Sequence, residues 1–327
     1  MGHNGPVRGR GRGWLILLCV TLCCALLLDP IMTTAANRRT TPQPAQTSWK
    51  LAFQDDFDGS SLNERIWETQ YPWGRDRRAV GELQWYASNE SNPSNPFKVA
   101  NSMLQISAKP IQPGQTQQPG ENHSYSSGLI STHKSFATEY GRFEIRCKLP
   151  RGKGLWPAFW LLPTDTSWPP EIDVFENIGT EPNTVHMTTH WLENGNHRQS
   201  GKEFVGPDFS KDFHTFAVEW TATTMIWYVD GVERHRVENG SPRGQMYLLA
   251  NMAVGGSWPG APDADNRAFP ATFDIDYIRA YTAEAAPSAK PLDDNGKGKK
   301  DKGKNTDGKR KKKKRKGRIA RANAANS

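Results

Sequence analysis

The sequence predicts an all-β fold, a β-sandwich of two packed antiparallel sheets, and two observations support this class. Short strand-like segments are separated at close intervals by turn residues, and no ten-residue stretch shows a convincing 3.6-residue period. The roughly 230 residues from Trp49 to Thr282 suffice to bury one large core. Many short antiparallel strands in one such domain favour the jelly roll among the sandwiches.

Individual strands are recognised by alternation and by turns. In GRFEIRCKL (141–149), Phe, Ile, Cys and Leu alternate with Glu, Arg and Lys, which is typical of a half-buried antiparallel strand. Asp230-Gly231, between two strand-like runs, predicts a tight hairpin. Further strands are expected at 102–109, 214–220, 224–233 and 245–254.

Residues 1–36 have the pattern of a secretory signal peptide. Three Arg and no acid in residues 1–13 precede the apolar run 14–28, and the small residues TTAA suit cleavage after Ala36. A membrane anchor is the alternative, but the run is shorter than the roughly 20 residues that a spanning helix needs. We therefore expect a secreted protein, extracellular or periplasmic, with a polar, proline-bearing linker at 37–48.

Residues 283–327 form a strongly basic tail. They hold sixteen Lys or Arg and five Asp or Glu, a net charge of +11, and their composition predicts disorder. Subtracting this +11 and the +2 of residues 1–36 from the whole-chain +8 leaves −5 for residues 37–282. The basic charge therefore belongs to an appendage. Its expected partner is an anionic cell-surface polymer, acidic polysaccharide or membrane surface, with no specific nucleic acid; a solvated extension without a partner remains the alternative.

Cysteine usage excludes one source of stability. Three of the four Cys lie in the predicted signal peptide, which leaves Cys147 alone in the mature chain. No intrachain disulfide is then possible, so the domain must depend on its hydrophobic core.

The most informative segment is WPPEIDVFENIG (168–179). In a regular strand Glu171 and Asp173 share a face, whereas Glu176 is out of phase by one residue. One β-bulge near Val174-Phe175 brings Glu176 back to that face, and bulges often re-aim side chains beside active sites. On a helix, Glu171 and Glu176 would lie about 140° apart. Only a bulged strand gathers all three acids.

Spacing connects these acids with glycoside hydrolysis. With the bulge absorbed, Glu171 and Glu176 are about 13 Å apart at Cα, and side chains leaning inward by roughly 4 Å each leave about 5 Å between the carboxyls. Retaining glycosidases need about 5–5.5 Å and inverting ones about 6.5–9.5 Å, so the spacing favours retention. Clustered acids also push their pKa values apart, so that one can stay protonated. The alternatives are a solvent-facing strand and a calcium cluster.

Aromatic residues surround this segment in the sequence. Trp156 and Trp160 precede the acids, His190 follows them, and Trp258 lies in GGSWPGAPD, among turn residues. Indole faces stack on sugar rings, and turns are where binding groups gather, so these four are candidate substrate-binding residues. For each Trp the alternative is a place in the core, and for His190 it is a structural role.

The chain resembles glycoside hydrolase family 16 through most of residues 49–282. The resemblance rests on the segments FQDDFDG, GELQWY, GRFEIRCKLPRGKGLWPAFWLLP, EIDVFENIG, the His190-Trp191 pair and NMAVGGSWPGAPD…FPATFDIDYIRAY. The acid spacing E-x-D-x-x-E is similar to that of the laminarinase-type branch, whereas the lichenase type has E-x-D-x-E. Residues 49–282 are accordingly identified as the catalytic domain.

The resemblance implies a jelly roll with a concave substrate cleft and a double-displacement mechanism. Glu171 would be the nucleophile, Glu176 the general acid/base and Asp173 the residue that tunes the pair. Trp156 and Trp160 would line the glycone subsites, and His190 would lie close to Glu176. No cofactor is required. Some members hold a structural calcium on the convex side, although no metal ligands can be assigned from this sequence. We expect a monomer.

Several functions fit this scaffold. The leading hypothesis is an endo-β-glucanase cleaving β-1,3 or mixed β-1,3/1,4 linkages. An endoglycanase acting on a bacterial exopolysaccharide and a transglycosylase are alternatives. A non-catalytic carbohydrate-binding protein usually lacks the acids, and here Glu171, Asp173 and Glu176 are all present.

Overall fold

A computed structural model describes residues 47–75, 80–88, 95–112 and 123–284. The predicted signal peptide, nearly all of the predicted linker and nearly all of the predicted basic tail lie outside these ranges. No helix in the described ranges is long and apolar enough to cross a membrane.

The described residues form strands and no α-helix. The strands are β1 (Trp49–Asp55), β2 (Gln84–Tyr86), β3 (Phe97–Val99), β4 (Leu104–Pro110), β5 (Tyr125–Ser127), β6 (Leu129–Ser131), β7 (Ala137–Thr138), β8 (Gly141–Lys148), β9 (Leu155–Pro163), β10 (Glu171–Glu176), β11 (Thr184–Glu193), β12 (Asn196–Val205), β13 (His214–Trp220), β14 (Thr224–Val229), β15 (Val232–Glu238), β16 (Met246–Val254) and β17 (Ala271–Ala283).

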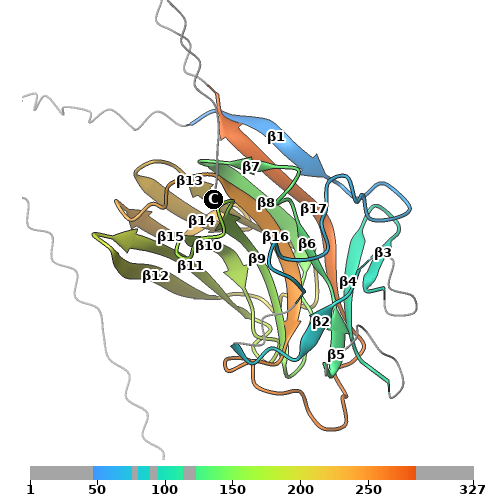
Figure 1. The fold of residues 1–327 in the computed structure, drawn as a ribbon. Helices are drawn as coiled ribbons and strands as arrows, with labels where there is room; N and C mark the ends of the chain where they lie inside the picture. The colour runs from blue at the N-terminus through green and yellow to red at the C-terminus, as the bar shows by residue number, and fades with distance from the viewer. Residues whose placement is uncertain (1–46, 76–79, 89–94, 113–122, 285–327) are drawn as a thin grey trace, which may run out of the picture. The chain divides into compact units, whose positions relative to one another are not determined.

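Two sheets pack face to face, as Figure 1 shows. The larger has ten strands, in the order β15-β14-β13-β8-β17-β4-β5-β2, with β1 beside β17 and β3 beside β4. The smaller has seven, in the order β12-β11-β10-β9-β16-β6, with β7 beside β16. Every strand pairing is antiparallel except the short β2–β5 contact. The predicted jelly-roll β-sandwich is confirmed.

The main core fills the space between the sheets. The alternation predicted for β8 is present, since Phe143, Ile145 and Cys147 are buried and the residues between them are half-exposed. From the opposite sheet, Ile172 and Phe175 of β10 enter the same core. Burying each large apolar side chain contributes about 1.5–3 kcal/mol relative to exposure, which explains how a domain with one buried free Cys holds together.

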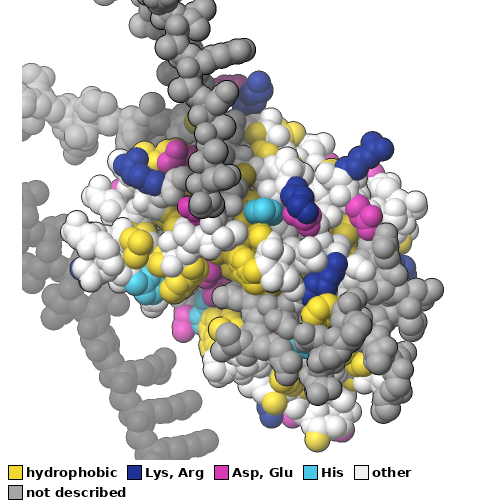
Figure 2. Space-filling model, in the orientation of Figure 1, with side chains coloured by type: hydrophobic (Ala, Val, Ile, Leu, Met, Phe, Trp, Pro, Cys, Tyr) yellow, Lys and Arg dark blue, Asp and Glu magenta, His cyan; other side chains and the backbone are white. Residues whose placement is uncertain are grey.

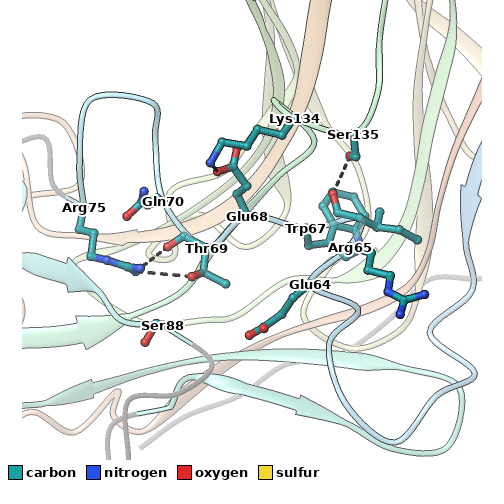
Figure 3. A pocket seen from close by; sticks show the side chains of 11 residues that line it. Glu64, Arg65, Trp67, Glu68, Thr69, Gln70, Arg75, Ser88, Lys134 and Ser135 are labelled. Atoms are coloured by element: carbon teal, nitrogen blue, oxygen red, sulfur yellow. Dashed lines mark hydrogen bonds and ion pairs between the residues drawn. The ribbon is translucent and has the colours of Figure 1, made fainter.

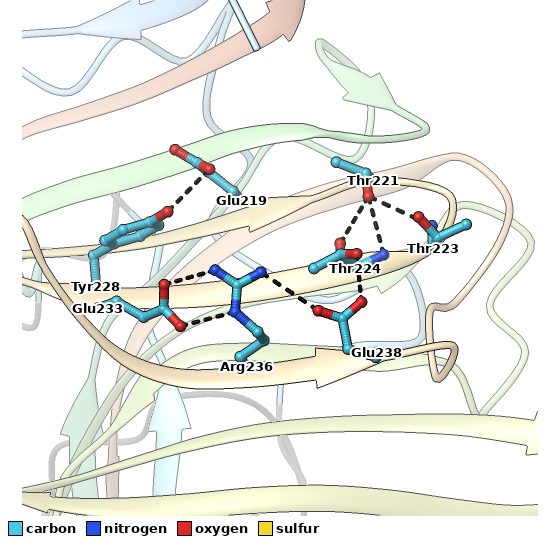
Figure 4. A network of polar contacts seen from close by, with 8 residues as sticks. All are labelled: Glu219, Thr221, Thr223, Thr224, Tyr228, Glu233, Arg236 and Glu238. Atoms are coloured by element: carbon cyan, nitrogen blue, oxygen red, sulfur yellow. Dashed lines mark hydrogen bonds and ion pairs between the residues drawn. The ribbon is translucent and has the colours of Figure 1, made fainter. Parts of the chain in front are cut away.

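The predicted Asp230-Gly231 hairpin joins β14 to β15. Both residues have positive φ, 51° and 74°, as a type I′ turn requires, and Val229 pairs with Val232 across it. Beyond the turn, Figure 4 shows Arg236 held between Glu233 and Glu238. Such charges on an edge strand oppose pairing with another chain.

A further polar contact joins the neighbouring strands β13 and β14. The Tyr228 hydroxyl donates to Glu219 at 3.1 Å, and burial together with this carboxylate raises the pKa of Tyr228 to about 12.

Lys and Arg side chains are scattered on the face seen in Figure 2 rather than gathered in one patch.

A second apolar cluster covers part of the other face of the seven-stranded sheet. Ala158, Trp160 and Leu162 of β9 point away from the main core, because successive side chains in a strand alternate. They pack with residues of the segment 57–88 and of β6 and β16, namely Tyr71, Tyr86, Leu129, Tyr247 and Leu249. This cluster forms a firm wall beside the acids of β10.

Candidate active site

The acids lie on β10 at a bulge where the sequence predicts one. Glu171 and Asp173 pair with His190 and Thr188 of β11, and Glu176 pairs with His186 after a shift in register. The shift also appears against β9, between Asp173 and Phe175. The predicted bulge at Val174-Phe175 is therefore confirmed.

Core packing explains the bulge. Val174 and Phe175 are adjacent and both fully buried, which a regular strand does not allow when one face looks outward. Phe175 packs on Phe216 of β13, with ring centroids 4.5 Å apart. Because two consecutive apolar side chains enter the core, Glu176 returns to the outer face, opposite Ala158 of β9.

The three acids line one depression enclosing about 310 Å³ of open space. Its other lining residues are Tyr71, Glu82, Trp156, Ala158, Trp160, Asn251 and Ala253. A second hollow adjoins it through Glu171 and is lined by Trp73, Leu162, Pro163, Thr166, Ser167 and Trp168. The two hollows therefore meet at Glu171.

Each outer acid receives a hydrogen bond from an indole. Trp156 Nε1 donates to Glu176 Oε1 at 3.1 Å, and Trp168 Nε1 donates to Glu171 Oε2 at 3.1 Å. A donor aimed at a carboxylate fixes its orientation and favours the ionised form. From the opposite sheet, Trp227 Nε1 donates to the backbone oxygen of Asp173 at 2.8 Å and anchors the strand just before the bulge.

The expectation that His190 lies close to Glu176 is wrong. His190 Nε2 lies 3.7 Å from Asp173 Oδ2 and 4.0 Å from Glu171 Oε1. β11 runs antiparallel to β10, so its later residue meets the earlier acid, and His186 is the residue paired with Glu176. Burial, and to a lesser extent the charge of His197, lowers the pKa of His190.

His186 occupies the matching place at the other end of β10. Burial lowers its pKa, although Glu203 and Glu181 oppose the shift. Its ring meets Trp258 edge to face, at 4.6 Å between centroids. The pattern HMTTHW contains both histidines, and counting the antiparallel register would have assigned each to its acid.

The predicted tryptophans take different places. Trp156 lines the depression and meets Trp258 edge to face at 5.6 Å. Trp258 is 44% exposed, so its ring is accessible to a ligand. Trp160 lines the same depression but is only 4% exposed, and its Nε1 donates to Asn251 at 2.7 Å. Trp160 is thus part of the wall and not an open platform.

The structure adds site residues that sequence reasoning did not single out. Trp73 and Trp168, at 50% and 54% exposed, flank the Glu171 side. Trp73 stacks on Tyr71 with ring planes 7° apart. Glu82 lies in the depression and accepts a 2.5 Å bond from Gln84. Its segment GELQWY, and the position of Trp168 three residues before Glu171, were the available signals.

One set of side chains could in principle hold a metal ion. Within the described ranges, Glu171, Asp173 and His190 form the set whose donor atoms converge, within 4.8 Å of one another. Glu171 and Asp173 line the depression, and acids clustered for catalysis have this spacing without a metal. We therefore assign none of them as a metal ligand, and the calcium that the resemblance allows remains a prediction.

A larger polar pocket, which none of the three acids lines, is shown in Figure 3 and encloses about 820 Å³ of open space. Lys134 pairs with Glu68 in this pocket, and Arg75 donates to the backbone oxygens of Thr69 and Tyr86 at 2.8 and 2.9 Å. Ser135 donates to the backbone oxygen of Ile66 at 2.6 Å. The pocket fastens the segment 64–75, which carries Tyr71 and Trp73 to the site.

Comparison with known proteins agrees with this geometry. A family model described as "Glycosyl hydrolases family 16" matches residues 83–279, and the chain belongs to that family. The chain is 39% identical over 244 residues to "Endo-1,3-1,4-beta-glycanase ExsH" of Rhizobium meliloti (strain 1021), covering 71% of this chain and 52% of the relative. It is 34% identical over 259 residues to "Beta-glucanase" of Rhodothermus marinus, covering 71% and 85%.

Solved structures show the same fold. The catalytic domain of an endo-1,3-beta-glucanase (laminarinase) from Thermotoga petrophila RKU-1 superposes with a TM-score of 0.63 at 32% identity. The superposition covers 73% of this chain and all of that one. Since this chain spans about half the length of two curated Rhizobium glycanases it matches, substrate and activity are treated as proposals below.

Proposed function

We propose that this protein is a secreted, retaining endo-glycosidase that hydrolyses β-1,3 or mixed β-1,3/1,4 linkages in a β-glucan. The observation that carries the proposal is the bulged strand β10. It presents Glu171, Asp173 and Glu176 to one depression, with an indole N–H on each outer acid. Family membership supports the same reaction class.

In the first step of the proposed reaction, Glu171 attacks the anomeric carbon and Glu176 gives its proton to the departing glycosidic oxygen. The bond from the anomeric carbon to that oxygen breaks, and a glycosyl–Glu171 ester forms. In the second step Glu176, now ionised, takes a proton from water. That water attacks the anomeric carbon and releases Glu171. Two inversions give net retention.

The remaining residues prepare the two acids for these roles. The Trp168 N–H favours ionised Glu171 before attack. Asp173 lies between the acids along the strand, 2% exposed, and faces His190. Its charge adds to the field that keeps a proton on a neighbouring acid.

Exposed aromatic rings beyond both outer acids favour cleavage within a polysaccharide chain rather than at its end. Trp73 and Trp168 are exposed beyond Glu171, and Trp258 is exposed beyond Glu176. Rings on both sides of the scissile bond can hold sugars in both directions. A β-glucan as the substrate is supported by the names of the relatives, which include a beta-glucanase and an endo-1,3-1,4-beta-glycanase.

The test is product analysis with the purified protein on laminarin, lichenan and carboxymethyl-cellulose. We expect oligosaccharides from the first two, with the β anomer formed first by NMR. Initial formation of the α anomer would refute retention. If the protein cleaved an acidic bacterial exopolysaccharide and neither glucan, the proposed β-glucan substrate would be wrong and the exopolysaccharide would take its place. Chain-lengthened products would indicate transglycosylation.

No metal takes part in the proposed chemistry. Activity should therefore survive dialysis against EDTA, because the acids, the attacking water and the indole donors complete the reaction. If a structural calcium is present, EDTA should lower the thermal midpoint while leaving activity at 25 °C intact. Loss of activity in the folded, metal-free protein would contradict the assignment of the acids.

Export and tethering are proposed from the two ends of the sequence. We expect the mature protein to begin at Asn37 and to be a monomer, measurable by N-terminal sequencing and light scattering. The basic residues of 283–327 should hold it on anionic cell-surface polymer at low salt and release it at high salt. Equal retention of a chain lacking 285–327 would refute the tethering.

A further inference from the structure

A cluster of three rings lies beside Glu171, and the reaction as proposed above does not use all of it. It consists of Trp168, His190 and His197, from the segment before β10, from β11 and from β12. His190 Nδ1 and His197 Nε2 are 3.1 Å apart, and their rings are stacked, 5.3 Å between centroids and 21° between planes. The ring centroid of Trp168 lies 5.8 Å from that of His190 and 5.1 Å from that of His197.

The two ring nitrogens of His190 face different partners. Nε2 faces Asp173 Oδ2 at 3.7 Å and Glu171 Oε1 at 4.0 Å, whereas Nδ1 faces His197. Two of these titratable partners lie on β10 and one lies on β12. A neutral imidazole carries one N–H, so the placement of that proton decides what the acids meet.

Two arrangements of the histidine pair are possible. If His190 carried its proton on Nδ1 and donated to His197, its Nε2 lone pair would point at two carboxylates, which is repulsive. If His197 Nε2–H donates to His190 Nδ1, the His190 proton lies on Nε2 and points at the acids. The carboxylates favour the second arrangement, and a donated His197 N–H, which needs the lone pair of His190 Nδ1, excludes the Nδ1-protonated tautomer.

We propose that His197 is a positioning residue for the nucleophile: it donates to His190 Nδ1 and so holds the His190 Nε2–H toward Glu171 and Asp173. The lowered pKa of His190 keeps that ring neutral at neutral pH, the state in which the tautomer matters. His197 itself is exposed on β12 and acts only through His190.

The position of His197 in the fold supports this role. β12 is the edge strand of its sheet and is exposed along nearly its whole length, so packing places few demands on the residue at 197. Yet this side chain turns toward the site, while Arg198, its neighbour, forms an ion pair with Glu193 at the hairpin end. Trp168 covers both imidazoles and donates to Glu171, which links the pair to the same carboxylate.

The experiment compares three variants of the whole protein. His197→Phe keeps a ring beside Trp168 but removes the donor; His197→Gln restores an N–H close to the position of Nε2; Arg198→Ala is the control for altering β12. The His190 imidazole is observed by nitrogen-15 NMR and assigned with His190→Gln. In the unaltered protein at pH 7.5 we expect the Nε2-protonated tautomer.

For His197→Phe we expect a mixture of tautomers at His190 and about a tenfold lower kcat, with KM changed less than about twofold. The acidic limb of the kcat/KM profile should move to higher pH by about half a unit, since a donor to the ionised acids is weakened. His197→Gln should recover most of kcat and the original tautomer. Arg198→Ala should behave as the unaltered protein.

The proposal is overturned if His197→Phe leaves the tautomer and the pH profile unchanged, or if His197→Gln gives no recovery while folded. It rests on the assignment of Glu171 as nucleophile. The NMR result does not depend on activity, so a fixed tautomer in a protein with another nucleophile would refute the assignment alone. A mixed tautomer in the unaltered protein would refute the positioning role alone.

Discussion

The two ends of β10 are built from the same parts, arranged differently. At each end an acid receives an indole N–H at 3.1 Å and faces a histidine in register on β11. At the Glu171 end, the indole comes from Trp168, in the segment before the strand and 54% exposed, and the imidazole approaches two acids. At the Glu176 end, the indole comes from Trp156 within β9.

The histidines differ most. His190 has carboxylates on one nitrogen and His197 on the other, whereas His186 Nε2 has no hydrogen-bond partner among the described residues. His186 Nδ1 lies 3.7 Å from Glu203, and its ring packs on Trp258. The acid at one end thus lies beside a histidine that also contacts a second acid and a second imidazole, whereas the acid at the other end is paired with a histidine that packs on an indole.

The largest expected effect separates the roles of the two acids. Glu171→Gln should lower kcat about 10⁵-fold on every substrate, because the covalent step is lost. Glu176→Gln should be as severe on laminarin, but on an aryl glycoside whose leaving group needs no proton it should lower kcat/KM, which reports the first step alone, only about tenfold. Steady-state kinetics on both substrates distinguishes the two. If the responses to the aryl glycoside were exchanged, the roles would be reversed.

Removing the charge between the two ends should have the next largest effect. Asp173→Asn keeps the size of a side chain that is 2% exposed, but it removes a carboxylate near His190. We expect kcat to fall about 10²- to 10³-fold with little change in KM, because the negative charge that keeps a proton on the neighbouring acid is lost. Circular dichroism provides the folding control. A change confined to KM would show that Asp173 binds sugar instead.

The two indole donors can be compared directly by Trp168→Phe and Trp156→Phe. Each change removes one hydrogen bond to a carboxylate while keeping an aromatic ring, and each should lower kcat/KM about tenfold to a hundredfold. Trp168→Phe should move the acidic limb of the pH profile to higher pH. Trp156→Phe should instead move the limb set by the pKa of Glu176, also to higher pH, because each carboxylate loses a donor. Identical shifts in both variants would show that the two ends are not separately controlled.

The smallest effect concerns stability against pH. Burial lowers the pKa of both His186 and His190 in the folded protein. Their contribution to stability is therefore complete above the unfolded value of about 6.5 and is lost as the pH falls below it toward the lowered pKa. His186→Gln should reduce the drop in thermal midpoint between pH 7.5 and 5.5. An unchanged drop would mean that other groups determine this loss.

Much of the fold could be predicted from the local pattern of apolar, polar and turn residues. The alternation in 141–149 and the Asp230-Gly231 turn identified strands and a hairpin that the structure contains. The bulge followed from the spacing of three acids around Val174-Phe175, because a two-residue period leaves only one way to place them on one face.

Contacts between distant segments could not be read in the same way. A two-residue period gives the face of a side chain but not its neighbour, which depends on the register between strands far apart in the sequence. His190 was therefore matched to the wrong acid, and Trp160 was expected to bind sugar although the segment 57–88 covers it.

By itself, then, the sequence determined the fold class, the family resemblance and the three acids with their bulge, because these depend on local periodicity and spacing. Only the tertiary structure decided which ring serves which acid. It brought Trp168 and His190 to Glu171, Trp156 to Glu176, and His197 to His190. Those contacts come from four different segments, and the packing of two sheets fixes their register.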